Sequence, residues 1–413
     1  MKKTMITLFA VGASAALLFT GCSNNGGGGA TTTTTTTSAP VATSTTSAPP
    51  VTTTTTTAPA VTTTTSAPAG DSITPSTGFP AGATIGVSLP QKTSENWVLA
   101  EGLFNTGLTK AGYKPMVSFA DGGVTEQQNQ IQTMIEQGAK VIVIGAIDGK
   151  QLGAQLEAAK KAGITVIAYD RLLMNTQDVD MYVAYDNCKV GTLQGTALLE
   201  GLAAQQGPSP WNIELIAGSP DDANSTPFFQ CAFDVLKPKI DDGTLKIPSG
   251  QTTQQQVATQ GWLAANVQTR FDAIMSGFYT GNTKLNGVLS PNDNLARGAL
   301  TSIEAAGKPD PVITGQDSEK ESVALVAQGK QYSTINKDTN TLVAKVIDIV
   351  NLLQKGSPVP VNDTKSYNNG VKVVPAYLLT PVIVTKENVC KAYDPATAAG
   401  QAAAATDLCK AAK

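Results

Sequence analysis

The chain contains no histidine in its 413 residues. Catalytic triads that use histidine as a base, metal sites with histidine ligands and histidine pH switches are therefore excluded. An enzyme built from this chain would have to use carboxylates, lysine, tyrosine, serine or cysteine instead. The formal net charge of −3 and the sequence pI of about 5.2 also give no support for nucleic acid or an anionic membrane surface as a partner.

Residues 1–22 have the pattern of an export signal that ends in a lipid-modified cysteine. The first three residues are Met-Lys-Lys, residues 5–19 are apolar, and small residues precede Cys22. The apolar segment is short for a membrane-spanning helix. We expect Cys22 to become the lipidated first residue after cleavage, which would anchor the protein on the outer face of the cell membrane; secretion without a lipid is the alternative.

Residues 23–77 are predicted to be a disordered stalk rich in threonine, proline and serine. Residues 31–37 and 52–57 are uninterrupted threonine runs, and large apolar residues are almost absent. Such a segment cannot offset the entropy of ordering. We interpret it as a spacer that holds a globular body away from the membrane. Its length would be useful in the thick wall of a Gram-positive-type cell, and O-glycosylation remains open.

The other four cysteines are an even number, which suits an oxidising compartment. Cys390 and Cys409 bracket an alanine-rich tail, residues 389–413, and a disulfide could close this tail as a loop. Cys188 and Cys231 lie in predicted helices, where they can be accounted for as small buried hydrophobic side chains.

From residue 83 onward, short apolar segments alternate with amphipathic ones, and the alternation starts afresh after residue 187. This pattern is typical of parallel sheets with helices on both faces, and two such series indicate two α/β lobes of similar design. The predicted strands are residues 84–89, 116–120, 140–146, 164–170, 181–187, 212–218, 287–290, 311–315 and 332–335. The predicted helices of the second series are residues 190–204, 225–236 and 254–275.

Polar side chains follow almost every predicted strand. Ligands of open parallel sheets bind beyond the carboxyl ends of the strands, and a cleft between two lobes is a preferred place. Taken singly, each such residue can instead be a helix cap, and Asp170 with Arg171 can be a solvated turn pair. The residues at these ends are Asn96, Trp97, Asp148, Asp170, Arg171, Asp221, Asp222, Asn224, Asn292, Asp293, Gln316, Asp317, Lys337 and Asp338.

Several carboxylates with one arginine and one lysine are better suited to a sugar than to an anion. Each sugar hydroxyl both donates and accepts, and charged groups make the stronger hydrogen bonds to it. A hard-metal site is the alternative, although no loop with EF-hand spacing is present. Trp97 and Trp262 are candidates to pack on the apolar face of a sugar ring, while Trp262 can also be read as a core residue.

Several of these segments resemble the solute-binding proteins of bacterial sugar ABC importers, over residues 83–388. The segments are VIAYDRL, YDN, NIELIAGSPDDAN, LSPND, TGQD, QYSTINKDT and VNDTKSYNNGVKVVPAYLLTPVIVTKEN. The closest group is that of D-xylose-binding and multiple-monosaccharide-binding proteins. The resemblance implies the type I periplasmic-binding fold, in which two Rossmann-like lobes with parallel sheets are joined by a three-segment hinge.

On this chain the resemblance implies an N-terminal lobe of residues 78–187 with 338–367 and a C-terminal lobe of residues 188–337 with 368–388. The three crossings would lie near Asn187, Lys337 and Tyr367. Trp262 would be a stacking or contact aromatic, and Asp293 would be adjacent to the ligand loop. The sugar-binding residues expected on this basis are Asn96, Trp97, Asp170, Arg171, Asp222, Asn224, Trp262, Asn292, Asp293, Asp317 and Lys337.

One departure from the family matters: this sequence has Asn96 where the family has an arginine before the tryptophan. The loss of a forked donor puts the particular sugar in doubt, although not the ligand class.

The resemblance implies a monomeric receptor, without cofactor or metal, that captures a monosaccharide by lobe closure and delivers it to a permease. D-xylose, glucose, galactose and arabinose are the candidate sugars. A sugar receptor for chemotaxis or two-component signalling is the alternative. A Rossmann-type dehydrogenase is disfavoured because the G-x-G-x-x-G phosphate turn is missing. A sugar-responsive transcription factor is disfavoured because an export signal stands where DNA-binding helices would be.

Overall fold

The computed structural model describes residues 71–73 and 77–412 of the chain. Cys22, the export signal and most of the predicted stalk lie outside the described residues. Within them, β1 (Ser72–Ile73) pairs antiparallel with β12 (Val359–Pro360), and Ile73 packs on the core of the first lobe. The expectation that disorder runs to residue 77 is therefore wrong, because an apolar side chain before that boundary belongs to the fold.

The first lobe is built on a six-stranded sheet in which all neighbouring strands are parallel. Its central strands are almost entirely apolar and buried, apart from the half-buried Thr165 at the start of β5, as expected for strands covered on both faces. The order is β13-β6-β5-β4-β2-β3, with β2 at Thr84–Leu89, β3 at Lys114–Phe119, β4 at Val141–Ile144, β5 at Thr165–Tyr169, β6 at Met181–Tyr185 and β13 at Ala376–Leu379.

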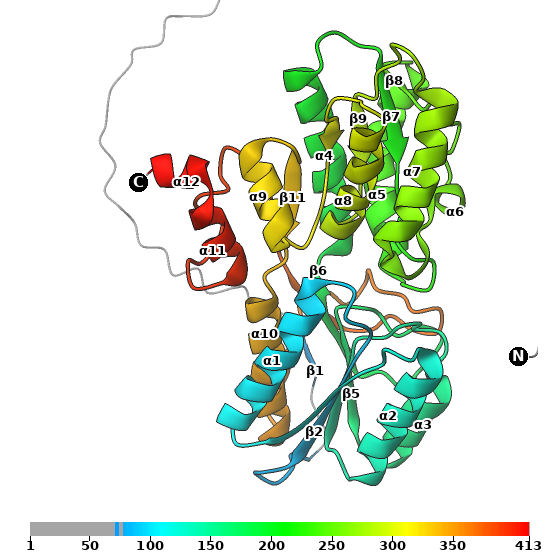
Figure 1. Cartoon of the computed structure of the whole chain (residues 1–413). Coiled ribbons are helices and arrows are strands. Elements are labelled where there is room, and N and C mark those ends of the chain that lie inside the picture. The colour runs from blue at the N-terminus through cyan, green and yellow to red at the C-terminus, as the bar shows by residue number, and fades with distance from the viewer. Residues whose placement is uncertain (1–70, 74–76, 413) are drawn as a thin grey trace, which may run out of the picture. The chain divides into compact units, whose positions relative to one another are not determined.

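Two pairs of helices cover this sheet, as Figure 1 shows. Alternate residues of a strand point to opposite faces. Val141 and Val143 of β4 therefore pack toward α1 (Glu95–Lys110) and α10 (Thr339–Gln354). Ile142 and Ile144 pack toward the other pair, α2 (Val124–Glu136) and α3 (Gly153–Lys161). The sheet is thus closed off from water on both faces, and its carboxyl edge is left for ligands.

The second lobe repeats the plan on a smaller sheet of four parallel strands, in the order β10-β9-β7-β8. These are β7 (Trp211–Leu215), β8 (Leu245–Lys246), β9 (Gly287–Leu289) and β10 (Val312–Ile313). One face packs against α4 (Asn187–Gln205) and α5 (Ser225–Asp241). The other packs against α7 (Ala264–Phe278) and α8 (Asp293–Ala305). The prediction of two α/β lobes is confirmed.

The chain passes between the lobes three times. It crosses at residue 186 between β6 and α4, and at Lys337 between β11 (Ser333–Asn336) and α10. The third crossing was expected near Tyr367, with residues 368–388 in the second lobe. The structure contradicts this boundary, because β13 is hydrogen-bonded to β6 at the edge of the first sheet. The chain therefore crosses after β13, and β14 (Val382–Thr385) pairs antiparallel with β11.

The single helix predicted over residues 254–275 is also wrong. The structure has a short helix α6 (Gln254–Val257), two extended residues, a 3-10 turn η1 (Gln260–Trp262) and then α7. Gly261 and Trp262 both adopt positive φ, at 66° and 54°. This conformation ends any α-helix, and it turns the Trp262 side chain inward.

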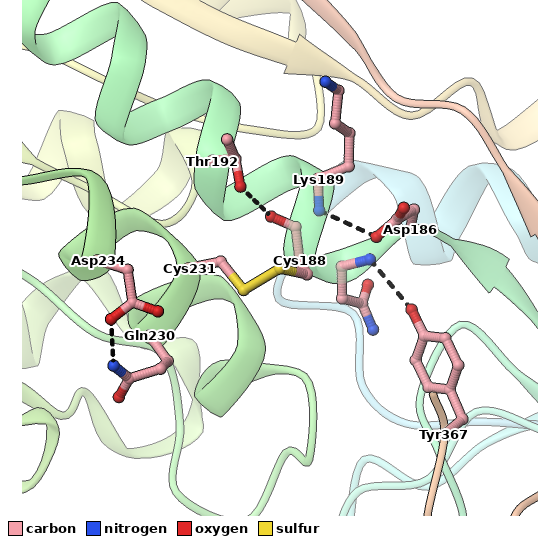
Figure 2. Close-up of a disulfide and its surroundings, with 9 residues drawn as sticks. Asp186, Cys188, Lys189, Thr192, Gln230, Cys231, Asp234 and Tyr367 are labelled. Carbon is pink, nitrogen blue, oxygen red and sulfur yellow. Dashed lines mark hydrogen bonds between the residues drawn. A yellow bond between two sulfur atoms is a disulfide. The ribbon is translucent and has the colours of Figure 1, made fainter. Parts of the chain in front are cut away.

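Helices α4 and α5 of the second lobe pack unusually close together. A Cβ atom on Gly191 would lie 2.4 Å from the Phe228 carbonyl oxygen, so only glycine allows this approach. A disulfide between Cys188 and Cys231 joins the two helices, with 5.3 Å between their Cα atoms (Figure 2). Our interpretation of these two cysteines as isolated buried hydrophobes was therefore wrong, since close helix packing brings them together.

The disulfide lies at the first crossing, as Figure 2 shows. The Asp186 carboxylate accepts a hydrogen bond from the Lys189 backbone N–H at 2.9 Å and so caps α4. The neighbouring Asn187 N–H donates to the Tyr367 hydroxyl at 3.2 Å. The start of the second lobe is thus fixed by a cap, a cross-link and a hydrogen bond.

Beyond β14 the chain forms α11 (Ala398–Ala405) and α12 (Asp407–Ala411), which pack on α9 (Lys320–Gln328). A second disulfide, between Cys390 and Cys409, closes this segment. Among the described helices, none combines the length and the apolar character needed to cross a bilayer.

Candidate functional site

A small polar cavity lies between the carboxyl edges of the two sheets. Ten of the eleven residues predicted to bind sugar line it, together with Ser94, Phe228 and Gln316. Its free volume of about 30 Å³ has room for no more than a few water molecules. The lobes must therefore separate before a larger ligand can enter. The predicted residues on its wall are Asn96, Trp97, Asp170, Arg171, Asp222, Asn224, Trp262, Asn292, Asp317 and Lys337.

Arg171 follows β5 and is the main charged link from the first lobe to the second. It is only 5% exposed, and its Nε lies 3.0 Å from Oδ2 of Asp222. Its Nη1 donates to the Ala146 carbonyl at 3.0 Å, and its guanidinium lies 5.3 Å from the centre of the Trp97 ring. Arg171 is therefore buried and held by these contacts, so the alternative that Asp170 and Arg171 form a solvated turn pair is wrong.

Asp170 stands beside Arg171 in a left-handed conformation, with φ at 59°. Such a backbone is strained for a residue other than glycine, and strain of this kind gathers at ligand sites. The Asp170 carbonyl accepts a hydrogen bond from Asn224 Nδ2 of the second lobe at 2.8 Å. The side-chain oxygen Oδ1 of Asn224 in turn accepts hydrogen bonds from the Tyr182 hydroxyl and from Asn187 Nδ2. Asn224 therefore ties the lobes together, and most of its amide is already occupied.

Lys337 reaches the cavity from the second crossing and faces carboxylates of both lobes. Its Nζ lies 3.2 Å from Asp317 Oδ1 and 3.6 Å from Asp170 Oδ2, and it also lies over the Phe228 ring. Burial lowers the pKa of Lys337, but Asp170 and Asp317 outweigh this effect and raise it to about 12. The lysine therefore remains a charged donor across the physiological range.

Two carboxyl groups of the second lobe, on Asp222 and Asp317, are removed from water. Burial raises the pKa of Asp222 even though Arg171 lowers it. Burial also raises the pKa of Asp317, against the opposing charge of Lys337. For both groups the loss of hydration outweighs the ion pair. A ligand that donates hydrogen bonds to these oxygens would supply part of the lost solvation.

Trp262 lies on the cavity wall because the helix breaks before it. Its Nε1 is 3.2 Å from Asp222 Oδ2, and its exposed fraction is 6%. The edge of the indole approaches Gly218 so closely that a Cβ there would lie 2.1 Å from it. Trp262 is therefore a core residue whose ring also borders the cavity. Its contact with a sugar ring stays a prediction.

Three amide side chains on the wall act in different ways. Asn292 accepts a hydrogen bond from the Leu295 backbone at 3.1 Å and so caps α8, a role that leaves its Nδ2 free to donate elsewhere. The side-chain amide oxygens of Asn96 and Gln316 are buried and have no hydrogen-bond partner among the described residues. Unsatisfied buried acceptors are costly in a native protein. In this cavity they fit a ligand with several hydroxyl groups.

Asp293 does not reach the cavity, which corrects its place among the predicted sugar-binding residues. Its side chain is fully buried behind the segment that carries Asp317. One oxygen accepts from the Glu319 backbone and from Thr334, both at 2.9 Å, and the other accepts from Gln331. Burial raises the pKa of Asp293 well above its ordinary value. Asp293 therefore supports the segment that carries Asp317 and does not line the cavity.

Sequence reasoning did not assign Ser94, Phe228 or Gln316 to the site. Gln316 stands at a strand end beside Asp317 and was among the strand-end residues, but the family resemblance did not carry it into the predicted sugar-binding set. Phe228 lies inside α5, where an apolar residue gives no sign of a ligand site. Ser94 is the N-cap residue of α1 and reads as a cap alone.

A second cavity, of about 540 Å³, lies behind the first on the side of the disulfide. It shares Asp222 and Asn224 with the first cavity, and the rest of its lining mixes apolar residues such as Met174 with polar and charged ones such as Lys150 and Asp363. The smaller cavity gathers the buried charges and the unsatisfied amides, and we assign the site to it. No cluster of three potential metal-ligating His, Cys, Asp or Glu side chains occurs in residues 71–73 and 77–412.

Two parallel α/β lobes joined by three crossings, with a polar cavity between them, define a class of proteins that bind ligands by closure. A model of the periplasmic binding protein domain matches residues 85–358, and the chain belongs to this family. The type I periplasmic-binding fold is confirmed.

The chain is 44% identical to the multiple sugar-binding periplasmic receptor ChvE of Rhizobium radiobacter, over 74% of this chain and 87% of that protein. It is 34% identical to the D-xylose-binding periplasmic protein of Escherichia coli, with the same two coverages.

Among solved structures, an ABC transporter solute binding protein from Clostridium phytofermentans with bound β-D-glucose is 41% identical, with a TM-score of 0.71. That match covers 74% of this chain and 94% of that one. A carbohydrate transporter solute binding protein from Chloroflexus aurantiacus in complex with D-glucose is 32% identical, with a TM-score of 0.68, over 75% and 94%.

Proposed function

We propose that this protein is an extracytoplasmic receptor that captures one monosaccharide between its lobes and delivers it to the permease of an ABC importer. The observation that carries the proposal is the cavity in which buried carboxylates of the second lobe face Arg171 of the first and Lys337 of the hinge. Each lobe supplies part of the site, so neither can enclose a ligand alone. Binding is therefore coupled to closure of the lobes.

A sugar matches the chemistry of this cavity better than an anion or a metal does. Asp222 and Asp317 accept from hydroxyl groups, while Arg171 and Lys337 donate to them. The mixture keeps the site near neutral, as an uncharged ligand requires. Trp97 and Trp262 provide aromatic surface for the apolar face of a pyranose. Micromolar capture corresponds to about −8 kcal/mol, which a handful of charge-assisted hydrogen bonds and one ring contact can supply.

The sugar is an aldopentose or aldohexose in this proposal. Two similar solved structures hold glucose, and one similar protein is named for D-xylose. The function is exchange of sugar between open and closed lobes, without a chemical step. Asn96, on the cavity wall, is a small side chain with a free acceptor, and it is the residue we expect to shape the choice among these sugars.

We further propose that the protein acts as a monomer on the outer face of the membrane, held by a lipid on Cys22 and a stalk before the folded body. The signal pattern of residues 1–22 supports this, together with the low apolar content that follows. The long stalk suits a cell of Gram-positive type. Mass spectrometry of the mature protein should find an acylated Cys22 at its amino terminus. A mature chain that starts elsewhere or carries no lipid would rule out the anchor.

A thermal-shift screen tests the sugar proposal. D-glucose, D-xylose, D-galactose and L-arabinose are each added to the purified protein. A sugar present at 100 times its Kd should raise the free energy of unfolding by about 2.7 kcal/mol. At least one should therefore raise Tm by several degrees, while L-glucose, the mirror-image control, should not. If no pentose or hexose shifts Tm, the ligand is a different small polar molecule.

A further inference from the structure

The C-terminal segment of the chain is attached to the part of the second lobe that carries Asp317. We use "appendage" for residues 390–412, which contain α11 and α12 and are closed by the disulfide between Cys390 and Cys409. The appendage packs on α9 and β14 (Figure 1). Its apolar contact is formed by Val323, Val326, Ala327, Val384, Val389, Ala403 and Cys409.

The appendage also reaches the ligand loop, which we define as residues 316–319. The Tyr393 hydroxyl donates a hydrogen bond to Ser318 Oγ at 3.0 Å. Ser318 directly follows Asp317, whose carboxylate faces Lys337 in the cavity. Burial raises the pKa of Tyr393 well above its ordinary value, so its hydroxyl keeps the proton that it donates.

The ligand loop has a conformation that needs such support. Asp317 and Ser318 are consecutive residues with positive φ, at 92° and 54°. A residue other than glycine is strained in this conformation, which persists only when its surroundings hold it. The backbone N–H groups of Asp317 and Ser318 donate to Ile335 and to Thr334, and that of Glu319 donates to Asp293.

All three backbone contacts come from within the second lobe, from β11 and α8. The Ser318 side chain is held differently, because its partner Tyr393 belongs to the appendage. The disulfide keeps the short segment around Tyr393 in place, since Cys390 is only three residues away.

We propose that Tyr393 is a positioning residue for sugar binding: through Ser318 it holds the strained ligand loop so that Asp317 faces the cavity. This rests on the proposed function. Without the tyrosine hydroxyl the loop samples other conformations, and only a fraction of molecules presents Asp317 correctly. The apparent Kd then rises by the inverse of that fraction.

Tyr393→Phe tests the proposal by removing only the hydroxyl. D-glucose and D-xylose are titrated calorimetrically, and the sugar with the lower Kd for the unmodified protein is used throughout. Loss of one neutral hydrogen bond corresponds to about a threefold to tenfold rise in Kd. Amide hydrogen exchange of residues 317–319, measured without sugar, should become faster by a similar factor.

Tyr113→Phe is the matched control. Its hydroxyl donates to Asn351 Oδ1 at 2.8 Å in the first lobe, and neither residue lines the cavity. Both variants lose one tyrosine hydrogen bond, so both should lower Tm slightly. Only Tyr393→Phe should raise Kd. Ser318→Ala should raise Kd as Tyr393→Phe does. The double variant should have a Kd no higher than that of either single variant, because both substitutions remove the same contact.

The outcomes separate the two proposals. If Tyr393→Phe leaves Kd unchanged while the unmodified protein binds sugar, Tyr393 has no positioning role. Additive effects of Tyr393→Phe and Ser318→Ala would also overturn it. If the unmodified protein binds neither these two sugars nor the others of the thermal-shift screen, the proposed function in its present form fails. Exchange of residues 317–319 in sugar-free protein then still decides whether Tyr393 holds the loop.

Discussion

The two lobes share one plan but hold their ligand groups in different ways. The first lobe has six strands and brings four of the predicted residues to the cavity: Asn96, Trp97, Asp170 and Arg171. The second has a four-stranded sheet and brings more groups, from several separate loops. Positive φ occurs among the cavity residues of both lobes, at Asp170 in the first and at Trp262 and Asp317 in the second. Among the described residues, both disulfides belong to the second lobe or its appendage.

This difference indicates how the molecule divides its work. A wide sheet with buried strands needs little help to fix one arginine at its edge. A smaller lobe that presents many groups on strained loops needs caps, cross-links and hydrogen bonds behind them. The charges divide in the same way. Arg171 comes from the first lobe, while its partner Asp222 comes from the second, so the ion pair exists only when the lobes are together.

The largest effect is expected from Arg171→Ala. This change leaves the Asp222 carboxylate buried without its guanidinium, and loss of one partner of a buried charge pair costs about 2–5 kcal/mol or more. We expect Kd to rise by roughly 100-fold or more, as measured by titration calorimetry.

Arg270→Ala is the control for this prediction. Arg270 is also a partly buried arginine, but it binds Gln251 and the Leu215 carbonyl within the second lobe and does not line the cavity. The Arg270→Ala substitution should lower Tm and leave the Kd for the sugar unchanged. Equal affinities for Arg171→Ala and the unmodified protein would remove Arg171 from the site.

Removal of the disulfide at the first crossing should mainly affect stability. Cys188→Ser combined with Cys231→Ser opens a loop with a sequence separation of 43 residues. The free energy of unfolding in urea should fall by about 2–4 kcal/mol. Kd should stay the same, because neither cysteine lines the sugar cavity.

Cys390→Ser combined with Cys409→Ser provides the contrast. This pair should weaken sugar binding, since it loosens the appendage that carries Tyr393. If both pairs of substitutions change Kd equally, the two disulfides do not differ in function, and the division of roles within the second lobe is wrong.

Gln316→Leu should separate affinity from stability. The Gln316 Oε1 has no partner among the described residues, so its removal should leave the sugar-free protein as stable or more stable. The ligand loses one acceptor, and we expect Kd to rise by up to about tenfold.

The matched control is Gln127→Leu in the first lobe. Gln127 donates to the Gly145 carbonyl and accepts from the Ile147 backbone, so its amide is satisfied within the protein. The Gln127→Leu protein should have a lower Tm than the unmodified protein and the same Kd for the sugar. A Gln316→Leu protein with lower Tm and unchanged Kd would show that Gln316 has only a structural role.

The smallest effect is expected from pH. The folded pKa values of Asp222 and Asp317 are raised by burial, so the sugar-free fold binds their protons more tightly than the unfolded chain does. Their contribution to stability is therefore fully present below the unfolded pKa of about 3.9 and is lost as pH rises through the raised folded values.

Sugar affinity should change in the opposite direction, because the ionised carboxylates accept hydroxyl donors more strongly. Kd should rise as pH falls through the raised pKa values, which begins at a higher pH than for a free aspartate. Calorimetry between pH 4 and pH 8 measures this, with Asp222→Asn as the variant in which the dependence is reduced. An unchanged Kd down to the pKa of free aspartate would contradict the raised values. The pKa of Lys337 is raised to about 12, so the stability that the charged lysine contributes to the fold is lost only in strongly alkaline solution.

The parts of this account that the sequence predicts are those set by local pattern. Apolar runs identified β4, β5 and β6 because strands covered on both faces are almost entirely apolar. The strand-end rule predicted that Asp170, Arg171 and Asp317 lie close together, and they line one cavity, since the carboxyl ends of parallel strands meet at one edge.

Other features depend on tertiary contacts that no local pattern reveals. Trp262 faces the cavity only because the extended residues Ala258 and Thr259, and then Gly261, interrupt the segment that the sequence predicts as one helix. Cys188 and Cys231 are joined only because glycine lets α4 approach α5. Asp293 has the same sequence context as a ligand residue, yet its side chain turns toward Glu319 and Gln331. A strand-end carboxylate therefore does not reveal whether it faces ligand or protein.

The most direct test of the central claim is a crystal structure of the protein with the monosaccharide that gives the largest thermal shift. We predict one sugar ring between the lobes, within hydrogen-bonding distance of Arg171 from the first lobe and of Asp222 or Asp317 from the second. A sugar in the larger cavity beside Tyr367, or one that contacts a single lobe, would contradict the account.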